Sequence, residues 1–184
     1  MSEKEKMLNG EMYYAPDEEL SEERIKVKEM TYDYNLLRPS KKKEKEVLIR
    51  KILGRAGKNI WIEAPFQCDY GYNIEVGDNF YSNHNLLILD CAKVRIGNNV
   101  FIGPNVSFYT AGHPINAKER NTLYEFANQI TVGDDVWIGG SVSILPGVTI
   151  GSNVVIGAGS VVIKDIPSNS IAVGNPCKVI KNIK

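Results

Sequence analysis

The sequence contains only two histidines and three cysteines among 184 residues. A zinc site built from three histidines is therefore excluded, and we expect no metal requirement. Cys68, Cys91 and Cys177 are far apart and lack the spacing of metal ligands, so we expect reduced, packed thiols. His84 is near Cys91 in the sequence, but a catalytic cysteine is much the weaker interpretation of that proximity.

The chain also lacks an excess of charge and any long apolar run. Its 22 basic residues balance its 22 acidic residues, which predicts no nucleic acid and no membrane as a partner. The longest aliphatic stretches are far shorter than the roughly 20 residues of a membrane-spanning helix. The first six residues carry charges of both signs and no apolar signal region, so we expect a cytoplasmic protein.

What the sequence has in abundance is an aliphatic residue at every sixth position. Neither a helix nor a flat strand has this period, whereas hexapeptide repeats stacked into a parallel β-helix do. Glycine, asparagine and aspartate at the corners would tolerate the turn conformations. A sandwich of short strands, the alternative, would show a period of two. The two registers are Ile130, Val136, Val142, Val148 and Val154, and Val132, Ile138, Ile144, Ile150, Ile156 and Val162.

Three segments follow from these patterns. Residues 1–55 are expected to be helical, with one helix beginning near Ser21 and a second capped by Ser40 and ending at Gly54. Residues 56–175 are assigned to the β-helix, and residues 176–184 form a C-terminal tail. Val27, Met30 and Tyr34 mark the buried face of the first helix.

The six-residue period fails between residues 109 and 129, and this interruption contains His113. An insertion of that length in a regular solenoid is usually functional or disordered. Histidine can take a proton from a hydroxyl near neutral pH and return it. A surface histidine without a task is the alternative, but the position of His113 in the insertion favours a general base.

Together these stretches resemble the maltose and galactoside O-acetyltransferases, which are acetyl-CoA-dependent hexapeptide-repeat acyltransferases. The resemblance covers nearly the whole chain, and the helical N-terminal segment is its most selective part. The maltose type is the closer of the two. The stretches that carry it are residues 9–13 with Asp17 and Leu20, 68–74, 79–83, 110–114, 136–140 and 174–176.

The resemblance implies a left-handed parallel β-helix with a protruding loop, assembled as a homotrimer with each active site between two subunits. By position, His113 matches the catalytic base and Glu125 an acidic residue that orients it. Asn83 matches an asparagine near the reacting centre. The implied reaction is direct transfer of acetyl from acetyl-CoA to a hydroxyl, expected to be the 6-OH, of maltose, glucose or a related sugar.

The resemblance also implies binding residues for the two substrates. The Gly140 amide matches the oxyanion position. Lys178 and Lys181 replace two arginines near the nucleotide phosphates, although solvated lysines are the alternative. Asp17 has an alternative role as a helix cap, and Cys91 instead of Asp90 is the alternative for one acidic position. The predicted cofactor residues are Trp137, Gly140, Ala158, Ile163, Lys164, Lys178 and Lys181, and the acceptor residues are Asp17, Asp69, Tyr81, Asn83 and Asp90.

Two other functions remain open at this stage. The same His113 chemistry would acetylate a non-sugar acceptor, such as an antibiotic or an amino acid. A catalytically silent binding trimer is the second alternative, and it predicts that acetyl-CoA is neither bound nor consumed.

Overall fold

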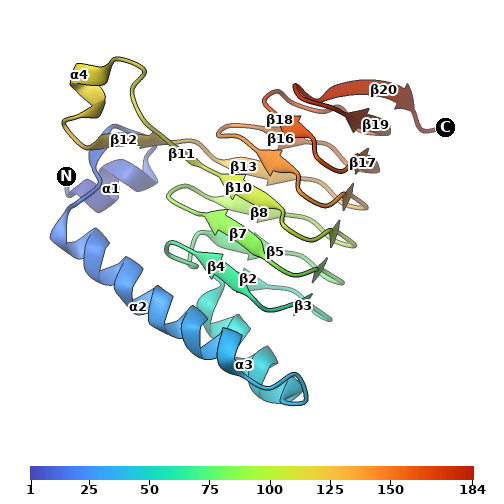
Figure 1. The fold of residues 1–184 in the computed structure, drawn as a ribbon, viewed down its shortest axis with the longest axis horizontal. Coiled ribbons are helices and arrows are strands. Elements are labelled where there is room, and N and C mark those ends of the chain that lie inside the picture. The colour runs from blue at the N-terminus through green and yellow to red at the C-terminus, as the bar shows by residue number, and fades with distance from the viewer.

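The computed structural model describes residues 1–184, and a left-handed parallel β-helix forms its body (Figure 1). Three sheets make the faces of a triangular prism. The first sheet contains β2 (Arg55–Ala56), β5 (Ile74–Val76), β8 (Val94–Ile96), β13 (Ile130–Val132) and β16 (Thr149–Ile150). The second contains β3 (Trp61–Ile62), β6 (Tyr81–Ser82), β9 (Phe101–Ile102), β14 (Trp137–Ile138), β17 (Val154–Ile156), β19 (Ser170–Val173) and β20 (Lys178–Asn182). The third contains β4 (Phe66–Cys68), β7 (Leu86–Leu89), β10 (Ser107–Tyr109), β15 (Ser143–Ile144) and β18 (Val161–Val162).

The chain visits the three sheets in the same order in every coil, which defines three edges of the prism. We call the corner between the first and second sheets the 1–2 edge, and name the 2–3 edge and the 3–1 edge in the same way. Within these three sheets all strand pairs between coils are parallel, and the one antiparallel pair joins β20 to β19. The architecture confirms the β-helix that the six-residue period predicts.

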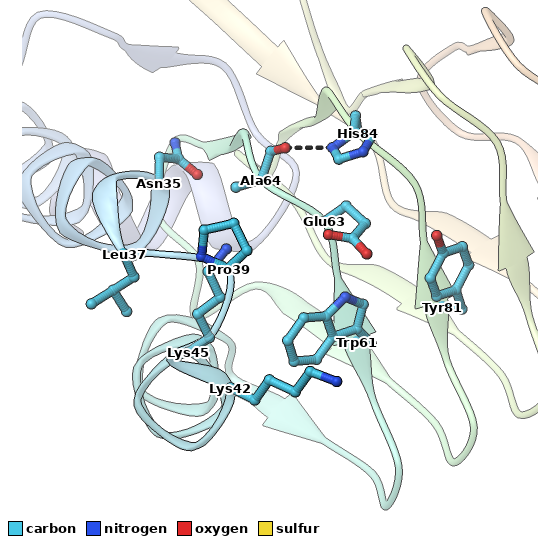
Figure 2. A pocket seen from close by; sticks show the side chains of 10 residues that line it. All are labelled: Asn35, Leu37, Pro39, Lys42, Lys45, Trp61, Glu63, Ala64, Tyr81 and His84. Carbon is cyan, nitrogen blue, oxygen red and sulfur yellow. Dashed lines mark hydrogen bonds between the residues drawn. The ribbon is translucent and has the colours of Figure 1, made fainter.

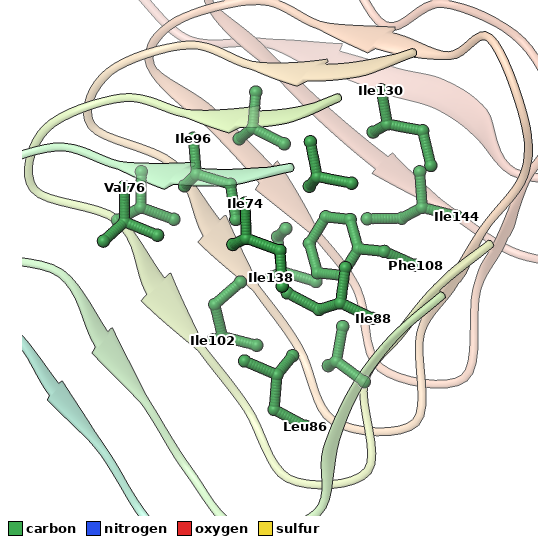
Figure 3. Packing of buried hydrophobic residues seen from close by; sticks show 14 of the residues in the cluster. Ile74, Val76, Leu86, Ile88, Ile96, Ile102, Phe108, Ile130, Ile138 and Ile144 are labelled. Carbon is green, nitrogen blue, oxygen red and sulfur yellow. The ribbon is translucent and has the colours of Figure 1, made fainter. Parts of the chain in front are cut away.

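The repeated aliphatic side chains form the core of the prism. They belong to one cluster of 34 buried residues, and Figure 3 shows them pointing inward from successive coils. Ile74 pairs with Val94, and Val94 with Ile130, so equivalent positions stack along the axis. Each side chain withdrawn from water in this way contributes roughly 1.5 to 3 kcal/mol. No coil buries this surface alone, which is why the repeats must stack.

Asparagines stack along the 1–2 edge and explain the corner residues of the repeat. Asn79 and Asn99 adopt φ angles of 57° and 54°, in the left-handed region that asparagine tolerates better than most residues. The Asn79 side-chain amide donates to the Asn99 carbonyl oxygen at 2.9 Å, and Asn99 donates in turn to Asp135 at 2.9 Å. The corner residues therefore form the turn and also connect one coil to the next.

Three helices precede the coil: α1 (Glu3–Leu8), α2 (Glu18–Leu36) and α3 (Lys42–Ile52). The predicted caps were wrong in both longer helices. Asp17 caps α2, because its carboxylate accepts from the Leu20 amide at 3.2 Å, so the helix begins before Ser21. Lys41 stands at the start of α3 without a side-chain cap. Val27 and Tyr34 are buried as predicted and join the core of the coil.

The insertion at residues 109–129 projects from the 3–1 edge and lies beside the N-terminal segment (Figure 1). It contains β11 (Ala111–Gly112), α4 (Ala117–Arg120) and β12 (Tyr124–Ala127). β12 pairs antiparallel with β11 and with β1 (Tyr13–Tyr14), giving the sheet order β1-β12-β11. The loop is therefore held by a strand that is separated from the coil in sequence by two helices, α2 and α3. All three cysteines of the chain are free and buried. None of the helices is both long and apolar enough to span a membrane.

Candidate active site

His113 and Glu125 lie together in the projecting loop at the 3–1 edge. His113 directly follows β11, and Glu125 lies in β12, the strand paired with β11. The Nε2 atom of His113 is 3.7 Å from Oε1 of Glu125, and the histidine side chain is 54% exposed. The pair thus combines an accessible imidazole with a nearby carboxylate that can stabilise its protonated form.

Asp69 and Cys91 lie on the coil below this loop, at the same edge. The Cys91 Sγ donates to Oδ2 of Asp69 at 3.8 Å. Burial raises the pKa of Asp69, although Arg24 and Lys28 of α2 oppose the shift. Burial also raises the pKa of Cys91 to about 12, so the thiol stays protonated near neutral pH and is a poor nucleophile.

Asp90 has a structural position that argues against its predicted contact with an acceptor. Its side chain is completely buried, and Oδ1 accepts from the backbone amides of Asp69 and Tyr70 at 3.0 and 2.9 Å. Burial raises the pKa of Asp90 to about 6, and Oδ2 has no hydrogen-bond partner. The neighbouring Cys91, named above as the alternative for this acceptor position, is the residue whose side chain contacts the Asp69 carboxylate.

Asp17 is likewise engaged in the fold. Its carboxylate caps α2, as the bond from the Leu20 amide shows. This is the alternative role that the sequence left open. Of the predicted acceptor residues near the loop, Asp69 is the one whose side chain is neither fully buried nor used as a cap.

Asn83, Gly140 and Ala158 lie on the 2–3 edge, and Tyr81 lies just before it on β6. The Asn83 side-chain oxygen accepts from the His84 amide at 2.8 Å, which leaves its NH2 group free to donate. The Gly140 amide makes no hydrogen bond to the protein backbone, so it is free to donate to an incoming oxygen. A backbone amide in this state meets the chemical requirement for oxyanion stabilisation.

A cavity of about 600 Å³ lies between α3 and the second sheet, where Glu63, Ala64 and His84 of the 2–3 edge line it (Figure 2). The rings of Trp61 and Tyr81 line it from the second sheet, and Lys42 and Lys45 line it from α3. His84 closes one side, where its Nδ1 is 2.6 Å from the Ala64 carbonyl oxygen. His84 therefore has a local hydrogen-bonding role. The cavity has the size of a small-molecule site and mixes aromatic walls with charged groups.

Apart from Gly140 and Ala158 on the 2–3 edge, the predicted cofactor residues lie on the second sheet and on the 3–1 edge. Trp137 pairs with Val155, Val155 with Ile171, and Ile171 with Lys181, so these residues form one row across the sheet. At the spacing of neighbouring strands the row spans roughly 14 Å. Lys178 is exposed on β20, opposite Val173. Ile163 and Lys164 follow β18 and therefore lie on the 3–1 edge.

The two halves of the predicted site do not meet within one chain. The loop, Asp69, Ile163 and Lys164 belong to the 3–1 edge, whereas Asn83, Gly140 and Ala158 belong to the 2–3 edge. The five strands of the third sheet separate these edges. No cluster of three or more histidine, cysteine or acidic side chains is placed to hold a metal ion.

Similarity to known proteins decides the family. Residues 6–57 match the maltose acetyltransferase hexapeptide capping motif, and residues 129–164 match the bacterial transferase hexapeptide with six repeats. The galactoside O-acetyltransferase of Escherichia coli K12 is 45% identical over 97% of this chain and 88% of its own length. The chain belongs to the maltose and galactoside O-acetyltransferase family.

Solved structures of this acetyltransferase family match the fold over its full length. A maltose O-acetyltransferase from Clostridium difficile 630 superimposes with a TM-score of 0.99 and 53% identity, covering 100% of this chain and 98% of that one. A galactoside acetyltransferase in complex with coenzyme A superimposes with a TM-score of 0.97 and 44% identity, covering 100% and 92%.

Coenzyme A or acetyl-CoA is bound in solved structures of relatives. The protein is accordingly an acetyl-CoA-dependent O-acetyltransferase, with acetyl-CoA as its co-substrate.

The sequence interpretation missed one polar group of this acetyltransferase site. Tyr13 lies in β1, and its hydroxyl donates to Oε2 of Glu125 at 2.8 Å. Tyr13 contributed to the family resemblance, but no period or spacing connects it with residue 125. Only the pairing of β1 with β12 brings the two together.

Proposed function

We propose that this acetyltransferase transfers acetyl to a primary hydroxyl, the 6-OH, of maltose, glucose or a related sugar, with His113 as the general base. The observation that carries the proposal is the His113–Glu125 pair, with an accessible imidazole 3.7 Å from a carboxylate. Asp69, below the loop at the same edge, offers a carboxylate to acceptor hydroxyls.

The reaction needs no covalent enzyme intermediate. The His113 nitrogen that faces away from Glu125 takes the proton of the sugar hydroxyl, and the sugar oxygen attacks the thioester carbonyl carbon. The Gly140 amide donates to the resulting oxyanion. Collapse of the tetrahedral intermediate breaks the carbon–sulfur bond, and His113 returns the proton to the departing thiolate. The products are an O-acetyl sugar and coenzyme A with a free thiol.

A homotrimer with the site shared between subunits is part of this proposal. It is supported by the separation of the groups that the reaction requires: within one chain His113 lies on the 3–1 edge, whereas Asn83 and Gly140 lie on the 2–3 edge. The second sheet also leaves Phe101 and Trp137 more than half exposed, at 53% and 58%. Packing the 3–1 edge of one copy against the 2–3 edge of the next would complete each site, as a closed ring of three requires.

An acceptor panel tests the chemistry. Release of free thiol from acetyl-CoA should depend on maltose, glucose or a galactoside in the wild type, and mass spectrometry should locate the acetyl group on a primary hydroxyl. Turnover with chloramphenicol or an amino acid but no sugar would favour the non-sugar alternative. Absence of acetyl-CoA binding would favour the silent trimer, and undiminished turnover in His113→Ala would refute the base.

Subunit mixing tests the shared site. Inactive His113→Ala and Asn83→Ala proteins are unfolded together at equal amounts and refolded. Half of the copies carry an intact His113, and the other half carry an intact Asn83. If each site of the closed ring takes His113 from one copy and Asn83 from the next, about one quarter of the sites are intact, so about one quarter of wild-type activity should return. If both residues serve the same chain, no activity returns.

A further inference from the structure

Three side chains form a row across the sheet β1-β12-β11. Tyr13 of β1 lies directly opposite Glu125 of β12. On the other side of β12, Gly112 lies opposite Phe126, so the next pair in this antiparallel register is His113 opposite Glu125. Directly opposite residues of antiparallel strands place their side chains on the same face. The row therefore brings Tyr13, Glu125 and His113 together in that order.

The two oxygens of Glu125 have different neighbours in this row. Oε2 accepts a hydrogen bond from the Tyr13 hydroxyl at 2.8 Å, and Oε1 is the atom 3.7 Å from Nε2 of His113. Two contacts on opposite oxygens fix the rotation of a carboxylate better than one contact can. Without the Tyr13 bond, the half-buried Glu125 side chain would be free to turn Oε1 away from the imidazole.

Tyr13 itself is held rigidly by a small second core. Its side chain is only 1% exposed and packs in a cluster with Met7, Leu20, Tyr70, Cys91, Ala92 and Ala127. Burial raises the pKa of the Tyr13 hydroxyl, and the nearby Cys91 and Glu125 raise it further. The hydroxyl therefore keeps its proton and acts as a donor to the carboxylate. The Asp69 carboxylate on the coil and the Glu125 carboxylate repel each other, whereas Arg24 of α2 acts on Asp69 and Tyr70.

We propose that Tyr13 is a positioning residue for the general base, acting through its hydrogen bond to Glu125. This inference rests on the proposed role of His113, and it assigns to the N-terminal segment a direct part in catalysis beyond covering the coil. The tyrosine hydroxyl holds the carboxylate so that Oε1 faces the imidazole, which stabilises the protonated histidine formed during acyl transfer.

The matched variants are Tyr13→Phe and Tyr14→Phe. Each removes one hydroxyl and keeps the ring, but Tyr14 lies opposite Tyr124, on the other face of the strand pair. Tyr13→Phe should lower kcat about tenfold, the scale on which one hydrogen bond to a carboxylate acts. KM for acetyl-CoA should stay unchanged, and Tyr14→Phe should retain wild-type kcat.

Two further readouts separate positioning from a merely structural role. The acidic limb of the kcat/KM profile should move to lower pH in Tyr13→Phe, because the protonated base loses the support of a fixed carboxylate. The protein has only two histidines, so in an NMR spectrum of the histidine ring protons His84 serves as an internal control for His113. The His113 signal should move in Tyr13→Phe, and the His84 signal should stay in place.

A double-mutant cycle with Glu125→Gln completes the test. Tyr13→Phe should cost little further activity once Glu125 is replaced, since the hydroxyl acts only through that carboxylate. An equal loss in both backgrounds, or wild-type kcat in Tyr13→Phe, would overturn the inference. Full activity in His113→Ala is a different result, because it refutes the proposed base regardless of Tyr13. A thermal melt of each variant identifies any loss that arises from unfolding.

Discussion

The molecule has two cores that differ in composition and in task. The first core, inside the coil and under the helices that cover its end, holds 34 buried residues, which are mostly aliphatic and repeat from turn to turn. The second core, beneath the projecting loop, holds seven, and it includes Tyr13, Tyr70 and Cys91 with polar groups at its margin. In the inner coils the aliphatic core residues have equivalents above and below. In the second core each side chain has a single position and no equivalent.

This difference shows how a regular scaffold acquires chemistry. Repetition gives the coil a stable and redundant body, because each turn supports the next. Catalysis needs groups of different kinds at set distances, which a repeat cannot provide along its length. The loop interrupts the repeat at the 3–1 edge, and the N-terminal segment supplies the packing that the loop lacks. Changes in the buried core of the coil should therefore act on stability, and changes around the loop on turnover.

Replacement of the base should give the largest effect. His113→Ala should lower kcat by about 10²- to 10⁴-fold, the usual contribution of a positioned general base, while the melting temperature stays that of the wild type. Lys118→Ala, an exposed change in the same loop, should be nearly neutral. A steady-state thiol-release assay with a saturating sugar measures both, and equal losses in the two variants would contradict the assignment.

A substitution that leaves a cavity in the core of the coil should lower stability and leave kcat nearly unchanged. Ile138 is fully buried in β14, so Ile138→Ala should lower the free energy of unfolding by about 2 to 5 kcal/mol. The kcat of the folded fraction should change little. Ile25→Ala, at a residue 59% exposed on α2, is the control and should stay within about 0.5 kcal/mol of the wild type. Urea denaturation followed by activity of the folded protein separates the two quantities.

Asp90 should make stability depend on pH at the boundary between the two cores. Its pKa in the folded protein is raised to about 6 from an ordinary value of 3.8. Between these values the folded state binds more protons than the unfolded state, so stability should fall as pH rises from about 4 to about 6 and stay lower above that window.

The variant Asp90→Asn should remove this dependence. It replaces the carboxylate by a neutral amide at a buried position where Asp90 Oδ2 has no hydrogen-bond partner. At pH 8 it should stabilise the protein by roughly 1 to 3 kcal/mol, and below pH 4 the difference should vanish. Thermal melts at both pH values measure the effect, and a pH-independent difference would exclude ionisation of Asp90 as its cause.

The smallest effect is expected at the C-terminal lysines. Lys181 ends the row that begins at Trp137, and exposed charge pairs contribute up to about 1 kcal/mol. Lys181→Ala should therefore raise KM for acetyl-CoA by up to about fivefold, less so at high salt. Lys51→Ala, on α3, should not change it. If Lys181→Ala and the wild type have the same KM for acetyl-CoA at low salt, Lys181 does not contribute to cofactor binding and is a solvated residue.

The coil was predictable from the sequence because its physics is periodic. An aliphatic residue every sixth position and asparagine at the corners are local patterns, and they fixed the faces, the core and the place of the insertion. The helix starts were less well predicted, since Asp17 and Ser21 are both good caps and only packing selects between them. The resemblance supplied the candidate site, but it did not distinguish a buried Asp90 from Cys91 beside Asp69. The Tyr13–Glu125 bond has no local pattern, because it depends on pairing across the fold.

The pairing of β1 with β12 joins segments that the ribosome makes far apart in time. Tyr13 is translated 112 residues before Glu125, whereas corner asparagines of adjacent coils, such as Asn79 and Asn99, are 20 residues apart. Closing the longer loop costs more chain entropy and is slower than stacking adjacent coils. We therefore expect the pairing of β1 with β12 to form after the first coils have stacked. Full turnover should therefore appear only after β1 and β12 have both been synthesised and have paired.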